Sequence, residues 1–166
     1  MSNRTSDCPP LLEAGEHVRS IDQIRELCVG RFPLSTTRYA IMDGFRKIVQ
    51  MLEQQRISCE VIVDGSYLTE EINPEDIDFA VVVSPAFYEN CTPEQRKLLD
   101  WIGEDKNIKR EHLCDCYLCV DYKQEDEGWF EGICDRMWWV NLWSKSVTYK
   151  RVRGIVIVRI SPESGL

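Results

Sequence analysis

Residues 61–83 read VIVDGSYLTEEINPEDIDFAVVV, in which two apolar runs enclose a Gly-Ser pair and an Asp-Ile-Asp triplet. The runs at 59–63 and 77–83 are short and rich in β-branched residues, which is typical of buried strands. Because successive side chains of a strand alternate between its faces, Asp76 and Asp78 should project from one side, about 6 to 7 Å apart. The stretch therefore predicts a pair of carboxylates at the start of a core strand.

Helices and strands alternate along the rest of the chain. Apolar residues recur at helical spacing after Ser35, and Thr92 is placed to cap a helix that has Pro93 at its first position. We expect helices over 36–54, from 93 to about 102 and over 129–143, and further strands over 113–122 and 154–160. This pattern predicts an α/β (α+β) fold with a small mixed β-sheet flanked by helices.

The first 34 residues are rich in Pro and Gly and are expected to form an N-terminal arm, 1–34, with a short helix near 21–28. The remaining residues, 35–166, are expected to form one domain. A chain of 166 residues with 43% hydrophobic composition can bury a single sizeable core.

The connection between two predicted strands indicates a third carboxylate near this pair. If the helix that begins after Thr92 is a crossover, the strands at 77–83 and 113–122 are parallel and their N-terminal ends lie side by side. Asp115 should then lie level with Asp76 and Asp78. Asp121 faces the same way but lies about 20 Å further along the strand, so it is a poor second candidate.

The region around these carboxylates has no basic residue of its own, since no Lys or Arg lies between Arg56 and Arg96. A divalent cation with oxygen ligands would balance the charge; a solvated acidic loop is the other reading. Carboxylates on two neighbouring strands can hold two Mg²⁺ (or Mn²⁺) ions about 4 Å apart, which clamp a transferred nucleotidyl group. Gly65 and Ser66 offer a backbone N–H and a hydroxyl to a triphosphate.

The same stretch resembles the polymerase-β-like nucleotidyltransferase superfamily, whose signature is an apolar strand ending in Gly-Ser, a short spacer, and Asp-x-Asp entering a second strand. Here Gly65-Ser66 is followed after nine residues by Asp76-Ile77-Asp78. Within this superfamily the stretch most resembles the small bacterial nucleotidyltransferase-like proteins. Tyr67, Thr69 and Pro74 also fit their pattern. The resemblance is specific over 65–78 and extends at the level of the fold over 36–160.

The resemblance implies a Mg²⁺-dependent nucleotidyltransferase that moves a nucleoside monophosphate from an NTP, such as ATP, to a hydroxyl of a macromolecular acceptor, an RNA end or a protein. Asp76 and Asp78 would hold the metal on the triphosphate, and Asp115 would bind the second metal and help to deprotonate the attacking hydroxyl. Gly65 and Ser66 would bind the nucleotide. Residues 35–166 would be the nucleotidyltransferase-like domain.

One departure from the family pattern favours an alternative. Many relatives carry a Lys or Arg soon after Gly-Ser, whereas this chain has Glu70 and Glu71. The nearest replacement is a basic stretch that could equally be a solvated edge: Lys145, Lys150, Arg151, Arg153 and Arg159. The alternative function is a non-catalytic binding module with the same fold, such as one half of a toxin–antitoxin or defence pair that binds a partner protein.

The remaining features restrict these hypotheses. Cys114, Cys116 and Cys119 suggest zinc or redox chemistry, but on a strand Cys119 faces away from the other two, which favours buried structural thiols. The Trp-rich segment between 129 and 143 predicts core or an interaction face, with base stacking as an alternative.

The composition narrows the set of partners and the location. A net charge of −8 argues against long, non-specific binding of DNA. The absence of an apolar run of about 18 residues or of a secretory signal predicts no membrane partner and a cytoplasmic location.

Overall fold

The structure, a computed structural model, describes residues 8–129, 135–145 and 153–162. Its described strands form a five-stranded sheet in the order β1-β5-β2-β3-β4. The central strand β2 is antiparallel to β3 and β5, whereas β1 is parallel to β5 and β4 is parallel to β3, so the sheet is mixed, as predicted. The strands are β1 (Gly15–Val18), β2 (Cys59–Asp64), β3 (Ile77–Val83), β4 (Cys114–Val120) and β5 (Gly154–Ile160).

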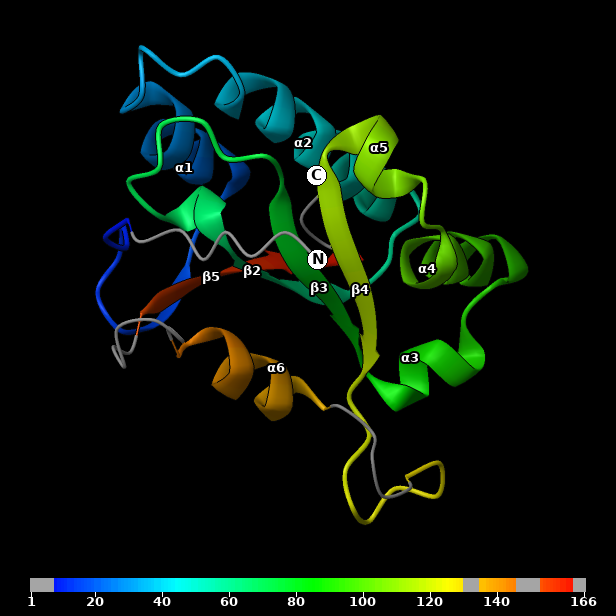
Figure 1. The fold of residues 1–166 in the computed structure, drawn as a ribbon. Helices are drawn as coiled ribbons and strands as arrows, with labels where there is room; N and C mark the ends of the chain where they lie inside the picture. The colour runs from blue at the N-terminus through cyan, green and yellow to red at the C-terminus, as the bar shows by residue number, and fades with distance from the viewer. Residues whose placement is uncertain (1–7, 130–134, 146–152, 163–166) are drawn as a thin grey trace.

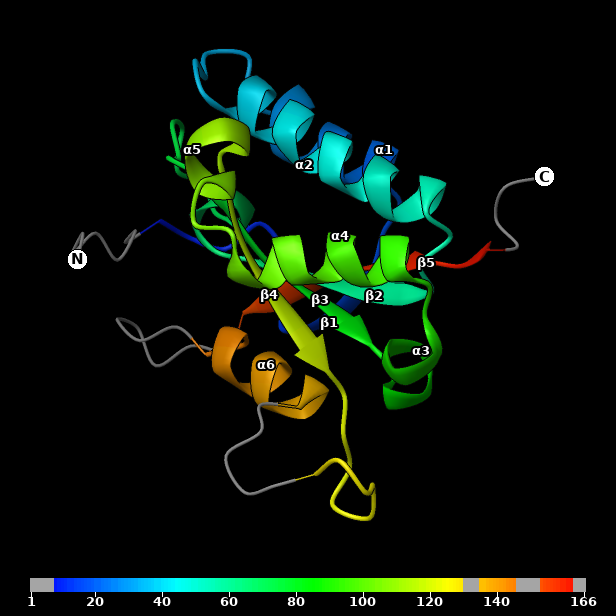
Figure 2. The same cartoon turned by 90° about the vertical axis from the view of Figure 1, so that its right-hand side faces the viewer.

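Helices lie on both faces of the sheet (Figure 1). Figure 2 shows α1, α2, α4 and α5 above one face and α6 below the other. A π-helical turn, η1, follows α1, and a 3-10 turn, η2, follows β2. The helical elements are α1 (Ile21–Arg25), η1 (Glu26–Gly30), α2 (Arg38–Gln54), η2 (Ser66–Leu68), α3 (Pro85–Asn90), α4 (Pro93–Glu104), α5 (Ile108–His112) and α6 (Arg136–Trp143).

The alternation of side chains along β3 divides the core into two clusters. Ile77 and Phe79 are fully buried in the larger cluster, where the ring of Phe79 packs edge-on against Phe45 of α2 at 5.1 Å. Ala80 belongs to the smaller cluster, on the α6 side of the sheet. Because Asp78 shares the face of Ala80, its carboxylate lies on the α6 side.

Most of the predicted elements are confirmed, with small shifts at their ends. The bounds of β3 and β5 are those predicted. In α4, Thr92 forms a capping box with Gln95 and Pro93 is the first residue, but the helix continues to Glu104. The aromatic-rich helix is α6, which begins at Arg136 rather than at Trp129: Trp129 and Asp135 are not helical, and residues 130–134 of the predicted helix lie outside the described residues.

Three elements have no counterpart in the prediction: β1, α3 and α5. Each is short, so it offers too few residues for a periodic pattern to emerge. β1 lies within the segment expected to be an arm and pairs with β5, and Ile24 and Cys28 from that segment are fully buried. The described part of this segment therefore packs as part of the sheet and its core.

The described helices include none that is both long enough and apolar enough to cross a lipid bilayer.

Arg38, the first residue of α2, is fully buried and binds backbone carbonyls. Its guanidinium donates hydrogen bonds to the carbonyl oxygens of Cys28, Tyr67, Thr69 and Glu71, at 2.6 to 3.1 Å. In return, the Tyr67 hydroxyl donates to the Arg38 carbonyl at 3.0 Å. Arg38 thus ties α2 to η1 and to the chain that follows the Gly-Ser pair.

We expect Arg38→Met to lower the free energy of unfolding by about 3 to 5 kcal/mol, because it leaves buried carbonyls without donors. Arg46→Met on the exposed side of α2 is the control. The Arg46 pair with Asp43 spans 3.4 Å at the surface, so its loss should cost less than about 1 kcal/mol. Urea unfolding measures both. Equal losses in the two variants would contradict the assigned role of Arg38.

Candidate functional site

The carboxylates predicted from the sequence meet at one end of the sheet. Asp78 in β3 pairs in register with Asp115 in β4, and the two strands are parallel, as the crossover argument predicted. Asp76 lies just before β3. The three carboxylates therefore lie at the N-terminal ends of neighbouring strands, and Asp121, at the other end of β4, is separate from them.

Asp64 is a fourth carboxylate in this cluster, which the sequence analysis missed. As the last residue of β2, it pairs in register with Asp78. Its side chain is only 3% exposed; Oδ2 accepts a hydrogen bond from Arg153 at 2.9 Å, while the buried Oδ1 has no hydrogen-bond partner in the structure. Period-2 alternation from Ile62 could have placed Asp64 on the face of Asp78 once the antiparallel register was known.

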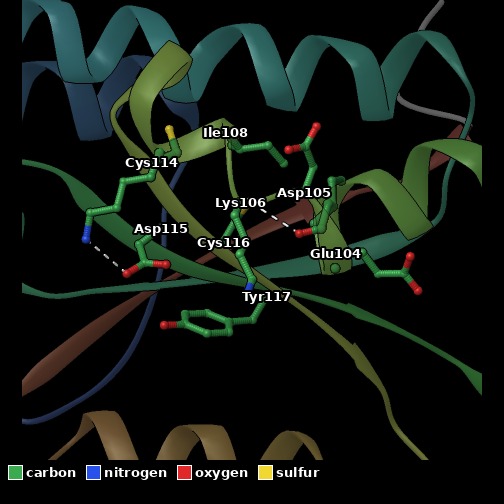
Figure 3. Close-up of a pocket in the computed structure, with 11 residues that line it drawn as sticks. Glu104, Asp105, Lys106, Ile108, Cys114, Asp115, Cys116 and Tyr117 are labelled. Atoms are coloured by element: carbon green, nitrogen blue, oxygen red, sulfur yellow. Dashed lines mark hydrogen bonds and ion pairs between the residues drawn. The ribbon is translucent and has the colours of Figure 1, made fainter.

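Lys109 in α5 provides a positive charge that the sequence analysis also missed. Its Nζ lies 2.7 Å from Oδ2 of Asp76 and 3.2 Å from Oδ2 of Asp115. The dashed line that ends on Asp115 in Figure 3 marks the second ion pair. The lack of basic residues between Arg56 and Arg96 therefore does not leave the cluster without a cation, because folding brings one from a distant helix.

The position of Lys109 depends on a close approach between α2 and α5. A Cβ at Gly44 of α2 would overlap the carbonyl oxygen of His112, the last residue of α5. Leu113 then adopts a left-handed conformation, with φ of 56°, and accepts a hydrogen bond from the Ile77 N–H at 3.1 Å. These contacts hold α5 against the start of β3 and place Lys109 within ion-pair distance of Asp76 and Asp115.

Gly65 allows the turn after β2 to approach Asp78. Its φ is 93°, in a region that side chains disfavour, and a Cβ there would overlap the carboxylate of Asp78. Ser66 is half-buried and begins η2, and its carbonyl accepts a hydrogen bond from the Thr69 hydroxyl at 2.7 Å. The Gly65-Ser66 turn thus lies directly beside the carboxylates, as the sequence analysis expected.

The crowding of carboxylates alters their acidity. Burial, and then the charges of Asp76, Asp115 and Asp64, raises the pKa of Asp78 to about 7, although Lys109 opposes the shift. Burial also raises the pKa of Asp64 to about 6, against the effects of Arg153 and the Gly65 N–H. Hydrogen bonding to Asp76 is the largest cause that raises the pKa of Lys109. The cluster therefore carries more negative charge than its two cations balance.

These residues are chemically suited to a divalent cation. Carboxylate oxygens are the ligands that Mg²⁺ and Mn²⁺ prefer, the Lys109 ammonium already stands between two of the carboxylates, and the buried Oδ1 of Asp64 lacks a partner. Among the residues that the structure describes, however, no three acidic, His or Cys side chains are arranged to hold an ion as they stand. The side chains would have to move to bind one.

A pocket of about 330 Å³ adjoins the cluster at the edge strand β4 (Figure 3). Lys109, Asp115 and Tyr117 line it, together with the C-terminal end of α4. The Tyr117 ring packs against Trp139 of α6 at 4.9 Å, and burial with nearby Asp115 and Asp78 raises the pKa of its phenol. An aromatic wall therefore stands on the same face of the sheet as the carboxylates.

Other sequence-predicted candidates lie outside the cluster. Cys114 and Cys116 are free thiols on the α2 side of the sheet, whereas Cys119 faces the α6 side, as predicted. In the basic stretch, Arg153 contacts Asp64, and Arg159 lies 3.5 Å from Glu60. Lys145 is exposed. Lys150 and Arg151 lie outside the described residues.

We expect Gly65→Ala to destabilise the protein by on the order of 2 to 4 kcal/mol, because the new methyl group meets the Asp78 carboxylate and the backbone conformation is strained. Gly30→Ala is the matched control, since a Cβ there has no atom within 4 Å. Thermal and urea unfolding measure both changes. A Gly65→Ala variant as stable as Gly30→Ala would contradict the proposed close packing of the turn.

The raised carboxyl pKa values predict that stability falls as the pH rises from about 4 to about 7. A carboxyl with a folded pKa above its unfolded value holds its proton better when folded, so its contribution is complete at low pH and is lost as the pH rises through the folded pKa. Asp78→Asn should remove on the order of 2 kcal/mol of this decline. Urea unfolding at several pH values measures it.

Glu125→Gln, in an exposed loop, should retain the pH dependence of the wild-type protein. An Asp78→Asn variant that keeps the full decline would show that Asp78 is not the titrating group.

Comparison with known proteins gives the family of this chain. Residues 5–159 match the family model described as "Family of unknown function (DUF6932)". No curated protein and no solved structure matches the chain. The matched residues include every member of the acidic cluster, Lys109 and the Gly65-Ser66 turn. Since the match spans nearly the whole sequence, the chain belongs to the DUF6932 family.

Proposed function

We propose that the protein is a Mg²⁺-dependent (or Mn²⁺-dependent) nucleotidyltransferase of the polymerase-β-like superfamily. It would transfer a nucleoside monophosphate from an NTP, with ATP the first candidate, to a hydroxyl of a macromolecular acceptor, an RNA end or a protein. We further propose that it acts in the cytoplasm. The observation that carries the proposal is the register of Asp78 with Asp115 on parallel strands, beside a glycine turn that closely approaches Asp78.

The proposal assigns a role to each residue of the site. Asp76, Asp78 and Asp115 would hold the metal, which supplies charge neutralisation at the phosphates when bound. Gly65 and Ser66 would bind the triphosphate through the turn that begins η2. Asp115 would also accept the proton of the attacking hydroxyl, a role supported by its place on the wall of the edge pocket, where an acceptor can approach.

The reaction would break the bond between the α-phosphorus and the bridging oxygen of the NTP. The acceptor oxygen forms the new bond to the α-phosphorus, its proton passes to the Asp115 carboxylate, and pyrophosphate leaves. Because the carboxylates lie at strand ends fixed by sheet hydrogen bonds, most of the rate enhancement would come from positioning and charge neutralisation.

Two observations favour the alternative function, a non-catalytic binding module such as one half of a toxin–antitoxin or defence pair. The Lys109 ion pairs already neutralise part of the cluster without a metal. Three apolar side chains of α6 are also about half exposed and could contact a partner protein: Met137, Trp138 and Leu142. In this alternative Asp78 has a structural role only, and its substitution leaves binding of the partner protein intact.

A nucleotide titration separates the two functions. We expect an excess of one NTP with Mg²⁺ to raise the melting temperature of the wild-type protein by about 5 to 10 °C, as for a ligand near 100 times its dissociation constant. Asp78→Asn should abolish this shift, measured from its own unliganded melting temperature. Asp121→Asn, at the other end of β4, should keep it.

The same NTP, labelled at the α-phosphate, should then label an RNA or protein fraction with the wild-type protein and not with Asp78→Asn. If no NTP shifts the wild-type protein at any Mg²⁺ or Mn²⁺ concentration, the enzyme hypothesis is wrong and the binding module takes its place.

A further inference from the structure

We propose that Lys109 is an internal counter-ion that competes with the metal for the carboxylates and then binds a phosphate of the nucleotide. In the metal-free protein its ammonium bridges Asp76 and Asp115; when a divalent cation binds there, the ammonium moves to the triphosphate. This inference rests on the proposed function and adds to it a phosphate-binding residue from α5, outside the motif that the sequence displays.

The geometry makes the two cations mutually exclusive. Lys109 Nζ lies 2.7 Å and 3.2 Å from the Oδ2 atoms of Asp76 and Asp115. A Mg²⁺ ion bound by the same oxygens lies about 2.1 Å from each, so it would stand within a few ångströms of the ammonium. Because a divalent cation repels the ammonium strongly at that separation, the ammonium must leave these oxygens for the metal to bind.

Lys109 can move without disturbing the fold. Its side chain is 55% exposed, compared with 16% for Asp76 and 33% for Asp115, so its four-carbon stem is free to swing toward solvent. The backbone of α5 is held by the contact between Gly44 and His112 and by the Leu113 N–H, which donates to the Lys109 carbonyl at 3.0 Å. Only the side chain needs to change its position.

A triphosphate is the anion that the displaced ammonium would meet. The chain after the Gly65-Ser66 turn carries Glu70 and Glu71, which would repel a phosphate there. Arg153 is engaged by Asp64 at 2.9 Å and by the Trp143 carbonyl at 3.0 Å. Lys109 lines the pocket and also pairs with two of the carboxylates, so it is placed to meet a phosphate bound between them.

Metal binding without nucleotide provides the first part of the test. Mn²⁺ titration of the full chain, followed by electron paramagnetic resonance, compares the wild-type protein with Lys109→Met, Lys109→Arg and Lys106→Met. Lys106 lines the same pocket, outside the two ion pairs. We expect Lys109→Met to bind Mn²⁺ about tenfold more tightly than the wild-type protein, because the competing charge is gone. Lys109→Arg and Lys106→Met should resemble the wild-type protein.

Binding of the metal–nucleotide complex provides the second part, measured by calorimetry with Mn²⁺ and a non-hydrolysable analogue of the NTP. Here Lys109→Met should lose its roughly tenfold advantage and bind no more tightly than the wild-type protein, because the lost phosphate contact offsets the removal of the competing charge. A purely structural role for Lys109 would weaken both interactions, and a counter-ion without a phosphate contact would strengthen both. A gain for Mn²⁺ alone is therefore specific to the exchange of partners.

Failure of this inference differs from failure of the proposed function. If all four proteins bind Mn²⁺ equally, or Lys109→Met binds it more weakly, the metal site stands and the role of Lys109 is overturned. If Lys109→Met binds both Mn²⁺ and the nucleotide complex about tenfold more tightly than the wild-type protein, the phosphate contact is wrong. If neither the wild-type protein nor Lys109→Met binds Mn²⁺, the inference and the proposed metal-dependent activity both fall.

Discussion

The buried guanidinium of Arg38 donates hydrogen bonds to several carbonyls of the chain segment 67–71. The carbonyls of Tyr67, Thr69 and Glu71 all accept from Arg38, which also donates to the Cys28 carbonyl of η1. A buried carbonyl without a donor costs about 1 to 3 kcal/mol, so this segment can follow its path only because one side chain supplies several donors in a fixed fork. The path in turn fixes the Gly65-Ser66 turn that precedes it.

A second constraint is the repulsion among the carboxylates. The antiparallel pair of β2 with β3 and the parallel pair of β3 with β4 bring Asp64, Asp78 and Asp115 side by side. The sheet hydrogen bonds hold this arrangement although like charges oppose it. Arg153 and Lys109 reduce the repulsion, but burial, and then the neighbouring carboxylates, still raises the pKa of Asp78 to about 7. Carboxyl groups whose pKa values are perturbed by burial together with specific charged neighbours cluster at functional sites.

The parts of this site that the sequence predicts are those encoded by local patterns. Alternation of apolar and polar residues places Asp76 and Asp78 at the start of β3, and a capped helix between two strands predicts the parallel pair that brings Asp115 level with them. Asp64 is not predictable in this way, because its neighbour in space depends on the register of an antiparallel pair.

Lys109 and Arg38 escape prediction for a different reason. Lys109 belongs to a helix of five residues that ends at His112. Leu113 follows it in a left-handed conformation, which is uncommon for leucine and which no sequence rule favours. Arg38 resembles any basic residue at the start of an amphipathic helix, where an exposed side chain is the ordinary expectation. Its burial follows from carbonyls that only the folded chain brings together.

Two of these contacts are made by α2, through Arg38 and Gly44. Its first residue, Arg38, donates hydrogen bonds to the chain after the Gly65-Ser66 turn. Gly44, nearly two turns further along, packs against the end of α5 and so helps to position Lys109 near the carboxylates. The turn that approaches Asp78 and the lysine that bridges Asp76 and Asp115 are thus positioned by a single rigid helix. Because the backbone on both sides is fixed in this way, an exchange of ligands at the site falls to the side chains, and the half-exposed ammonium of Lys109 is the one with room to move.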